Sequence, residues 1–257
     1  MPFPLESLEQ MQGFFWVLLR VGIIIFLLPL FGAKNFPAIW KAGLSFVLAI
    51  VLTPMVPPPE TLPETLPGIV VGLASEVLLG LSLAFVVKLT FAAVQLAGQF
   101  MAFQMGFSMA RAMDPVSGVQ STTLSQFLYL FMMLIFFSID GHHHLLQALV
   151  ASFQIVPPNG FHFDPALSGV LVKASSHMFL IALKIAAPVM IALFLSNLCL
   201  GIVARTVPQV NILMIGFPIN IGLGLIIFGL TLTIFPPFVS KITTGMGETL
   251  LHMLKLM

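Results

Sequence analysis

The sequence predicts an all-α membrane protein made of hydrophobic helical hairpins. Of its 257 residues, 59% are apolar and only 7% are Asp, Glu, Lys or Arg, whereas about a quarter of an ordinary soluble domain is charged. The mean hydropathy is +1.10, too high for a chain that must cover a water-facing surface with polar groups. The chain must therefore be solvated by lipid, by partner subunits, or by both.

A series of apolar runs supplies the predicted helices, and none shows the strand alternation of a membrane barrel. Lipid offers the backbone no hydrogen bonds, so each run is expected to be helical. A bilayer-spanning helix needs about 20 apolar residues, which makes 39–55 and 124–139 marginal and 145–156 too short. The run at 170–204 could form two short helices or one long helix broken at Pro188. The runs are 14–31, 39–55, 69–87, 89–110, 124–139, 145–156, 170–204 and 212–239.

Prolines and glycines mark the breaks between these runs. Consecutive prolines cannot continue a helix, so residues 55–67 are expected to form an extended polar loop. Residues 113–118 and 157–160 predict two further breaks, and Pro236 with Pro237 is expected to end the last run. None of these breaks resembles a flexible linker between domains. We therefore expect a single domain over residues 1–257.

The composition and motifs argue against several classes of function. A net charge of +1 provides no clustered basic face for nucleic acid, and the single cysteine, Cys199, cannot form an intramolecular disulfide. The sequence has no nucleophile elbow and no glycine-rich phosphate loop, so neither an enzyme nor a cofactor is expected. Asp140 with His142, His143 and His144 resembles a metal ligand set. However, neighbouring residues on a helix point about 100° apart, so three adjacent histidines cannot all face one ion and no metal site is expected.

The segment 94–115 carries two regular stripes of side chains. Small residues recur every four positions at Gly98, Ala102, Gly106 and Ala110, and methionines at Met101, Met105, Met109 and Met113. A four-residue step turns about 40° around a helix, so the two stripes wind together as neighbours. The small residues predict close helix packing, because another backbone can approach them in lipid. The methionines either fill gaps in the core or form a deformable seal around a variable cargo.

Charged side chains within or between the apolar runs form a further signal. Those singled out are Glu76, Lys88, Lys173 and Lys184. A charge at a helix centre costs roughly 2.5–3.5 kcal/mol on insertion scales, so each needs a partner or water. The alternatives are a structural ion pair or subunit contact, and a proton or ion relay. Structural pairing is favoured, because a relay usually needs more intramembrane carboxylates than Glu76 alone.

Taken together, three motifs resemble those of the FliR family of export proteins. In chain order they are Gln104-Met105-Gly106-Phe107-Ser108 continuing to Asp114-Pro115, the step Asp140-Gly141-His142, and Arg205-Thr206-Val207-Pro208-Gln209-Val210-Asn211 continuing to Ile215-Gly216-Phe217-Pro218. Their order and spacing match the family along nearly the whole chain. The amino-acid sequence at 215–218 is more similar to that of the flagellar branch than to that of the homologous virulence branch. The C-terminal signature comprises Arg205, Pro208, Gln209, Asn211, Gly216 and Pro218.

The resemblance implies a subunit of a type III protein export gate. FliR proteins assemble with FliP and FliQ in the bacterial inner membrane, within the flagellar basal body, and their fold looks like fused FliP-like and FliQ-like parts. The implied function is a gated channel for unfolded flagellar polypeptides. FlhB, FlhA and the rod proteins are the implied neighbours of the gate, and lipid surrounds it.

In the family, the loop around the Gln-Met-Gly signature plugs the closed channel. The resemblance assigns this role here to Gln104, Met105, Gly106, Phe107, Met109, Ala112 and Met113. Relatives can carry aromatic residues where this chain has Met109 and Ala112, so the aromatic character of the plug does not carry over.

The residues leave three other functions open. One is the homologous export-gate subunit of a virulence secretion system. Another is a small-solute secondary transporter, for which Glu76, Lys88, Gln95 and Gln99 are the available polar side chains. The last is a structural scaffold subunit that never touches cargo.

Overall fold

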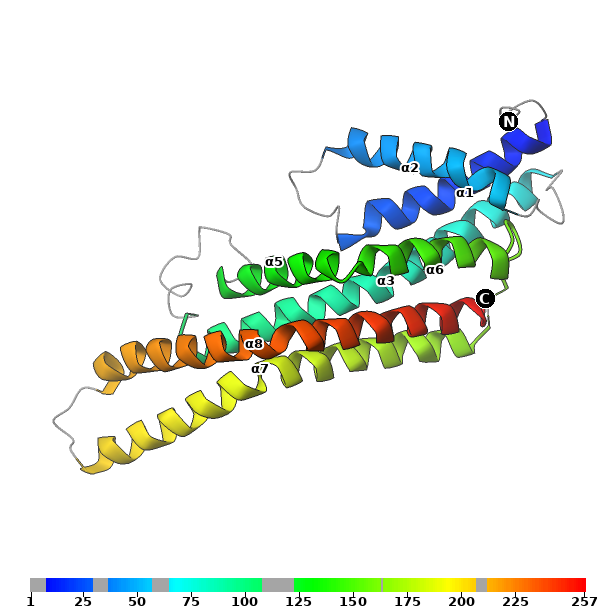
Figure 1. Cartoon of the computed structure of the whole chain (residues 1–257). Coiled ribbons are helices and arrows are strands. Elements are labelled where there is room, and N and C mark those ends of the chain that lie inside the picture. Colours follow the sequence, from blue (N-terminus) through cyan, green and yellow to red (C-terminus); the bar gives the residue numbers. More distant parts are fainter. Residues whose placement is uncertain (1–7, 30–36, 57–64, 108–122, 163, 207–211) are drawn as a thin grey trace. The chain divides into compact units, whose positions relative to one another are not determined.

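The computed structural model describes residues 8–29, 37–56, 65–107, 123–162, 164–206 and 212–257 (Figure 1). The regular elements within these ranges are all helical, which confirms the all-α prediction. In chain order they are α1 (Leu8–Leu27), α2 (Ala38–Leu52), the short 3-10 helix η2 (Thr53–Met55), α3 (Leu66–Gln104), α5 (Thr123–Ser138), α6 (Gly141–Ile155), α7 (Ala166–Thr206) and α8 (Ile212–Leu254).

The described ranges contain four helical segments long and apolar enough to cross a bilayer. α5 and α6, taken together as one bent span, would add a fifth. Only 17% of the most apolar stretch is buried inside the chain in both the first and the last of these segments. Lipid or partner subunits must therefore cover most of both helices. The four segments are Ala38–Met55, Leu66–Gln104, Ala166–Thr206 and Met214–Leu254.

Helix α3 is one uninterrupted element where the apolar runs predict two segments. It joins the runs at 69–87 and 89–110, and Lys88 between them is exposed on the helix surface. A lysine at such a position leaves the backbone hydrogen bonds intact. The helix begins at Leu66, so Pro67 lies in the first helical turn and not in the preceding loop. Proline is tolerated there, because the first N–H groups of a helix have no intrahelical partner.

Prolines also lie inside α7 and α8. Of the two alternatives for the run at 170–204, the structure has one long helix, with Pro188 in its interior. The expectation that Pro236 and Pro237 end the last run is wrong, because α8 continues through both. Phe235 and Val239, on either side of the pair, are buried. Packing of this kind can hold a membrane helix together where proline removes backbone hydrogen bonds.

The chain folds into two compact units assembled from distant parts of the sequence. Unit 1 takes in Met1–Thr90, Asp140–Ser175 and Thr243–Met257, and unit 2 takes in Phe91–Ile139 and Ser176–Ile242. α3, α7 and α8 each contribute residues to both units.

Unit 1 contains the hairpin of α1 and α2, which lie side by side in Figure 1. The rings of Phe14 and Phe46 meet edge to face across this hairpin, with centroids 5.5 Å apart. α1 also lies close to α3 at Gly80, where a Cβ atom would come within 2.8 Å of the Ile23 side chain. Gly80 therefore permits a close approach between α1 and α3.

Unit 2 is held by aromatic contacts and by one polar link. The rings of Phe91 and Phe136 meet edge to face at 5.4 Å, which packs α3 against α5. α7 and α8 run side by side (Figure 1), and Asn220 of α8 joins them. Its side-chain N–H donates to Asn197 Oδ1 over 2.8 Å, and its Oδ1 accepts from the Ser196 hydroxyl over 3.1 Å. Such polar contacts fix the register of apolar helices, which lack a hydrophobic driving force for association in lipid.

Candidate functional site

The Gln-Met-Gly signature forms the C-terminal cap of α3. The Phe107 N–H donates to the carbonyl of Ala102 and the Gly106 N–H to the carbonyl of Phe103, each over 3.0 Å. This pair of hydrogen bonds defines a Schellman motif, which satisfies carbonyls that the helix end would leave unpaired. Gly106 has a φ of +91°, a backbone conformation that residues with a side chain rarely adopt. The glycine of the signature is therefore required by the backbone.

The same cap packs against the part of the C-terminal signature that lies in α8. A Cβ atom on Gly106 would lie 2.8–2.9 Å from the ring of Phe217 in α8. One residue earlier, Met105 is completely buried. Its Cγ and Cε atoms lie against Gly224, which is also in α8. Two motifs far apart in the sequence thus meet within unit 2. This contact gives the segment after Gly106 a fixed starting point.

The described part of the methionine stripe lies in the core. Met101 and Met105 are 1% and 0% exposed, so both side chains do what the core-filling alternative predicts. At the end of α3 the outward-facing side chains are instead Phe103 and Phe107, which are 69% and 38% exposed. The other predicted plug residues, Met109, Ala112 and Met113, lie outside the described residues.

The small-residue stripe contains a position of very close helix packing. A Cβ atom on Gly98 would come within 2.5 Å of the Ser125 Cα atom, in α5. Any side chain at Gly98 would therefore displace backbone. Ala102, the next member of the stripe, is fully buried, and Ala110 lies outside the described residues.

The C-terminal signature is described in part. Gly216 is buried, Pro218 is exposed within α8, and Arg205 is exposed in the last turn of α7. The remaining members, Pro208, Gln209 and Asn211, lie outside the described residues.

Unit 1 contains a buried ion pair that the sequence analysis did not assign. Arg20 of α1 and Glu76 of α3 are 0% and 1% exposed. The Arg20 Nε atom donates to Glu76 Oε2 over 2.6 Å, and Nη2 donates to Oε1 over 2.8 Å. This two-pronged geometry is the strongest form of a carboxylate–guanidinium contact. Of the alternatives left open for Glu76, the structure contains the ion pair.

The remaining Arg20 contacts tie α6 to this pair. The Nη1 atom donates to the carbonyls of Ser152 and Val156, each over 2.9 Å. The guanidinium also lies over the ring of Phe153, with its Cζ atom 4.4 Å from the centroid. Arginine can make all these contacts because it carries five N–H donors in a fixed plane. One side chain thereby links α1, α3 and α6.

The loop after α6 is held by the same carboxylate. The backbone N–H of Asn159 donates to Glu76 Oε1 over 3.2 Å. Asn159 has a φ of +66°, in the left-handed region, and its Oδ1 atom lies against Gly72 together with the ring of Trp16. A Cβ atom on Gly72 would collide with both. The sequence signal for this cluster is Arg20, an arginine inside the otherwise apolar first run.

The three lysines singled out within or between the apolar runs face outward from the chain. Lys88, Lys173 and Lys184 are all exposed, and no ion pair of the described residues includes them. Water, lipid headgroups or partner subunits must therefore solvate these ammonium groups.

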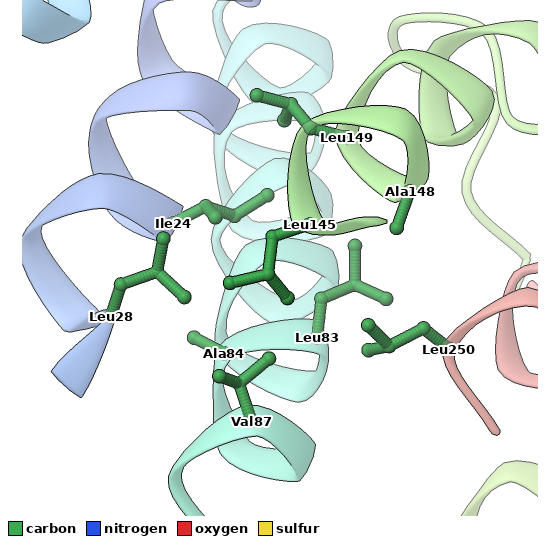
Figure 2. Close-up of a pocket in the computed structure, with 9 residues that line it drawn as sticks. All are labelled: Ile24, Leu28, Leu83, Ala84, Val87, Leu145, Ala148, Leu149 and Leu250. Atoms are coloured by element: carbon green, nitrogen blue, oxygen red, sulfur yellow. The ribbon is translucent and has the colours of Figure 1, made fainter. Parts of the chain in front are cut away.

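A small apolar cavity lies between α1, α3, α6 and the end of α8 in unit 1 (Figure 2). Its volume is about 20 Å³, close to the minimum that holds one water molecule. Its walls carry only aliphatic side chains, which give a polar solute no partner. This cavity is therefore no binding site for a transported solute. The lining residues are Ile24, Leu28, Leu83, Ala84, Val87, Leu145, Ala148, Leu149 and Leu250.

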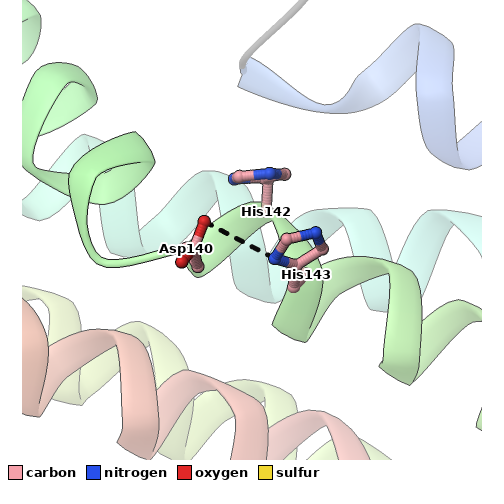
Figure 3. Close-up of side chains that lie close together, drawn as sticks. All are labelled: Asp140, His142 and His143. Carbon is pink, nitrogen blue, oxygen red and sulfur yellow. Dashed lines mark ion pairs between the residues drawn. The ribbon is translucent and has the colours of Figure 1, made fainter.

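Metal-ligating side chains gather at the start of α6 (Figure 3). Asp140, His142 and His143 each offer one ligand atom, and these atoms lie within 4.8 Å of one another. The expectation that the adjacent histidines cannot converge holds for the three of them, since His144 is not part of the group. Helix geometry does not exclude a smaller group, and Asp140, His142 and His143 do lie close together.

Four helical segments of membrane-spanning length in the described ranges, two of them with most of their apolar surface left uncovered by the chain itself, define a helical integral membrane protein. Residues 11–246 match the family model described as bacterial export proteins, family 1. The chain is 34% identical over 254 residues to the flagellar biosynthetic protein FliR of Bacillus subtilis (strain 168), covering 97% of each chain. It is 30% identical over 233 residues to the protein of that name from Escherichia coli (strain K12), covering 91% of this chain and 89% of the relative. The chain belongs to the FliR family of bacterial export proteins.

Proposed function

We propose that this chain is a subunit of the flagellar type III export gate, and that it forms with FliP and FliQ the gated channel for unfolded flagellar proteins. The family match over most of the chain supports the export role. The observation that supports the gating role is the contact between the C-terminal cap of α3 and α8, where Gly106 packs against the Phe217 ring. The proposed location is the bacterial inner membrane, in the flagellar basal body.

In this mechanism, the cap anchors an obstruction. The Schellman hydrogen bonds and the buried Met105 fix where the segment after Gly106 begins. Phe107, whose N–H completes the cap, is exposed and directs an apolar ring away from the core. The obstruction comprises Phe107 and the following residues through Met113. Unbranched and aromatic apolar side chains there would limit ion flow and still yield to an extended polypeptide.

The uncovered helix faces supply the contacts for assembly. α2 and α8 leave most of their apolar surface unburied by the chain itself, as expected of subunits that pack against companions in lipid. FliP and FliQ cover part of this surface in the assembled gate, while FlhB, FlhA and the rod proteins lie at its ends. The chain contributes the passage, and partner components supply the energy.

Ion conductance of the assembled gate in reconstituted membranes tests this function. Deleting residues 109–113 should raise ion leakage, because the cap stays in place while the obstruction shortens. Phe107→Ala should raise leakage in the same direction and by less. Phe103→Ala is the matched control, because Phe103 is an exposed aromatic residue that takes part in the cap only through its backbone carbonyl and precedes the obstruction. The conductance of this variant should equal that of the wild type.

Wild-type conductance in the deletion variant would contradict the gating role. Together with normal assembly, that result would favour the scaffold alternative, in which the chain never touches cargo. The cavity in Figure 2 gives no support to the small-solute alternative, since it is apolar and has room for little more than one water molecule.

A further inference from the structure

The Asp-Gly-His-His segment at the start of α6 has a geometry that the export role does not use. Asp140 precedes the helix with φ +56° and ψ +28°, in the left-handed region, and its carbonyl accepts the N–H of His143 over 2.9 Å. The Oδ1 atom of Asp140 lies 3.5 Å from Nδ1 of His143. The rings of His142 and His143 have centroids 4.3 Å apart. Figure 3 shows the carboxylate and both rings at the same end of the helix.

The left-handed residue explains why these side chains converge. On a regular helix, neighbouring side chains diverge by about 100°, and three adjacent residues cannot face one point. Asp140 stands outside the helical repeat, so its side chain is not bound by that rule. His142 and His143 still diverge, but each imidazole reaches far enough for one ring nitrogen to approach the carboxylate. His144 continues the helix and takes no part in the group.

The separations are compatible with one metal ion. Bonds of about 2.0–2.1 Å in a tetrahedral site place ligand atoms roughly 3.4 Å apart. The ligand atoms here lie within 4.8 Å of one another, and the His143–Asp140 pair is already at 3.5 Å. The side chains of His143 and Asp140 are well exposed, at 62% and 71%. Rotation about their side-chain torsions can therefore close the remaining gap without moving the core.

We propose that Asp140, His142 and His143 form a binding site for a divalent transition-metal ion of the zinc type. Two imidazoles and one carboxylate suit Zn²⁺, Co²⁺ or Ni²⁺, whereas Mg²⁺ and Ca²⁺ prefer all-oxygen ligands. Water fills the remaining coordination positions. The positive end of the α6 dipole opposes a cation at this place, and the Asp140 carboxylate offsets it.

A bound ion would lock the first turn of α6. It would hold Asp140 in its left-handed conformation, which otherwise costs a non-glycine residue free energy. α6 also carries the Ser152 carbonyl, and the residue that caps its C-terminus carries the Val156 carbonyl; both accept from Arg20. The site would therefore stabilise the helix that completes the buried ion pair, and metal should raise the unfolding temperature.

The test is a Co²⁺ titration of the full chain, purified without a polyhistidine tag, together with the subunits that co-purify, and stripped by a chelator. Visible absorption of Co²⁺ reports ligand binding directly, and Zn²⁺ should displace it. We expect a saturable site that is lost, or weakened at least about tenfold, in Asp140→Asn, His142→Gln and His143→Gln. His144→Gln is the matched control and should bind Co²⁺ as the wild type does.

The variants must also keep their fold without metal, which equal unfolding temperatures in the presence of chelator would show. If one variant fails this check, the other two decide the question. Zn²⁺ should raise the unfolding temperature of the wild type and of His144→Gln, but not that of His143→Gln. The proposal is overturned if the wild type shows no saturable binding, if the His142→Gln/His143→Gln double variant binds Co²⁺ equally well, or if His144→Gln loses the site.

Discussion

Replacing Glu76 with alanine should destabilise unit 1 by about 3–5 kcal/mol, because it leaves the Arg20 charge buried without a counter-charge. Arg20 is 0% exposed, so water cannot replace the lost carboxylate. Two hydrogen bonds of 2.6 and 2.8 Å disappear, and the Asn159 N–H loses its acceptor. The carbonyls of Ser152 and Val156 remain, but they are dipoles and do not neutralise a guanidinium.

Denaturant unfolding of the full chain in nanodiscs measures this effect. Trp16 is a local reporter, since it is buried in unit 1 and lies against Gly72. Trp40, the second tryptophan, is 68% exposed, so a Trp40→Phe background isolates the signal. Lys88→Ala is the matched control on the same helix, and it should change the free energy of unfolding by no more than about 0.5 kcal/mol.

A double variant separates the charge from the packing. Arg20→Met combined with Glu76→Leu removes both charges at similar volume, and such replacements are often neutral or stabilising. The double variant should therefore be clearly more stable than Glu76→Ala alone. The reasoning is refuted if Glu76→Ala unfolds within about 0.5 kcal/mol of the wild type, or if the double variant is no more stable than the single one.

The glycines of α3 give a further set of stability predictions. Gly106→Ala should cost about 1–3 kcal/mol, because an alanine must adopt a φ of +91° against the Phe217 ring. Gly98→Ala should cost about 1–3 kcal/mol through the collision with the Ser125 backbone. Gly229→Ala in α8 is the control, since nothing lies within 4 Å of its Cβ position, and it should stabilise the helix by about 0.5–1 kcal/mol. Equal unfolding free energies for all three variants would contradict the packing described for the end of α3.

The helices were predictable from the apolar runs, but several of their ends were not. Composition alone requires lipid or partner contact, and backbone hydrogen bonding in lipid then requires helices. Proline marks a boundary only where packing does not override it, and Phe235 and Val239 are buried beside Pro236 and Pro237. That burial is a tertiary property that the local sequence does not reveal. Lys88 likewise does not mark the end of a helix, because a lysine exposed on one helix face leaves the backbone hydrogen bonds intact.

The candidate site shows the same division between local and long-range signals. Gly106 is recognisable locally, because a glycine after a long apolar run predicts a helix C-cap. Its contact with Phe217 depends on the approach of α8, which no spacing rule supplies. Glu76 could be identified as needing a partner, but Arg20 lies 56 positions away in the sequence. A single sequence taken by itself offers no means to pair them.

Affinity purification of the tagged full chain from bacterial membranes tests the central claim most directly. If the chain is the proposed gate subunit, with α2 and α8 leaving most of their apolar surface uncovered, it should co-purify with two other small hydrophobic membrane proteins. Mass spectrometry would identify these as FliP and FliQ. Recovery of the chain as a stable monomer in detergent, with neither protein present, would contradict the account.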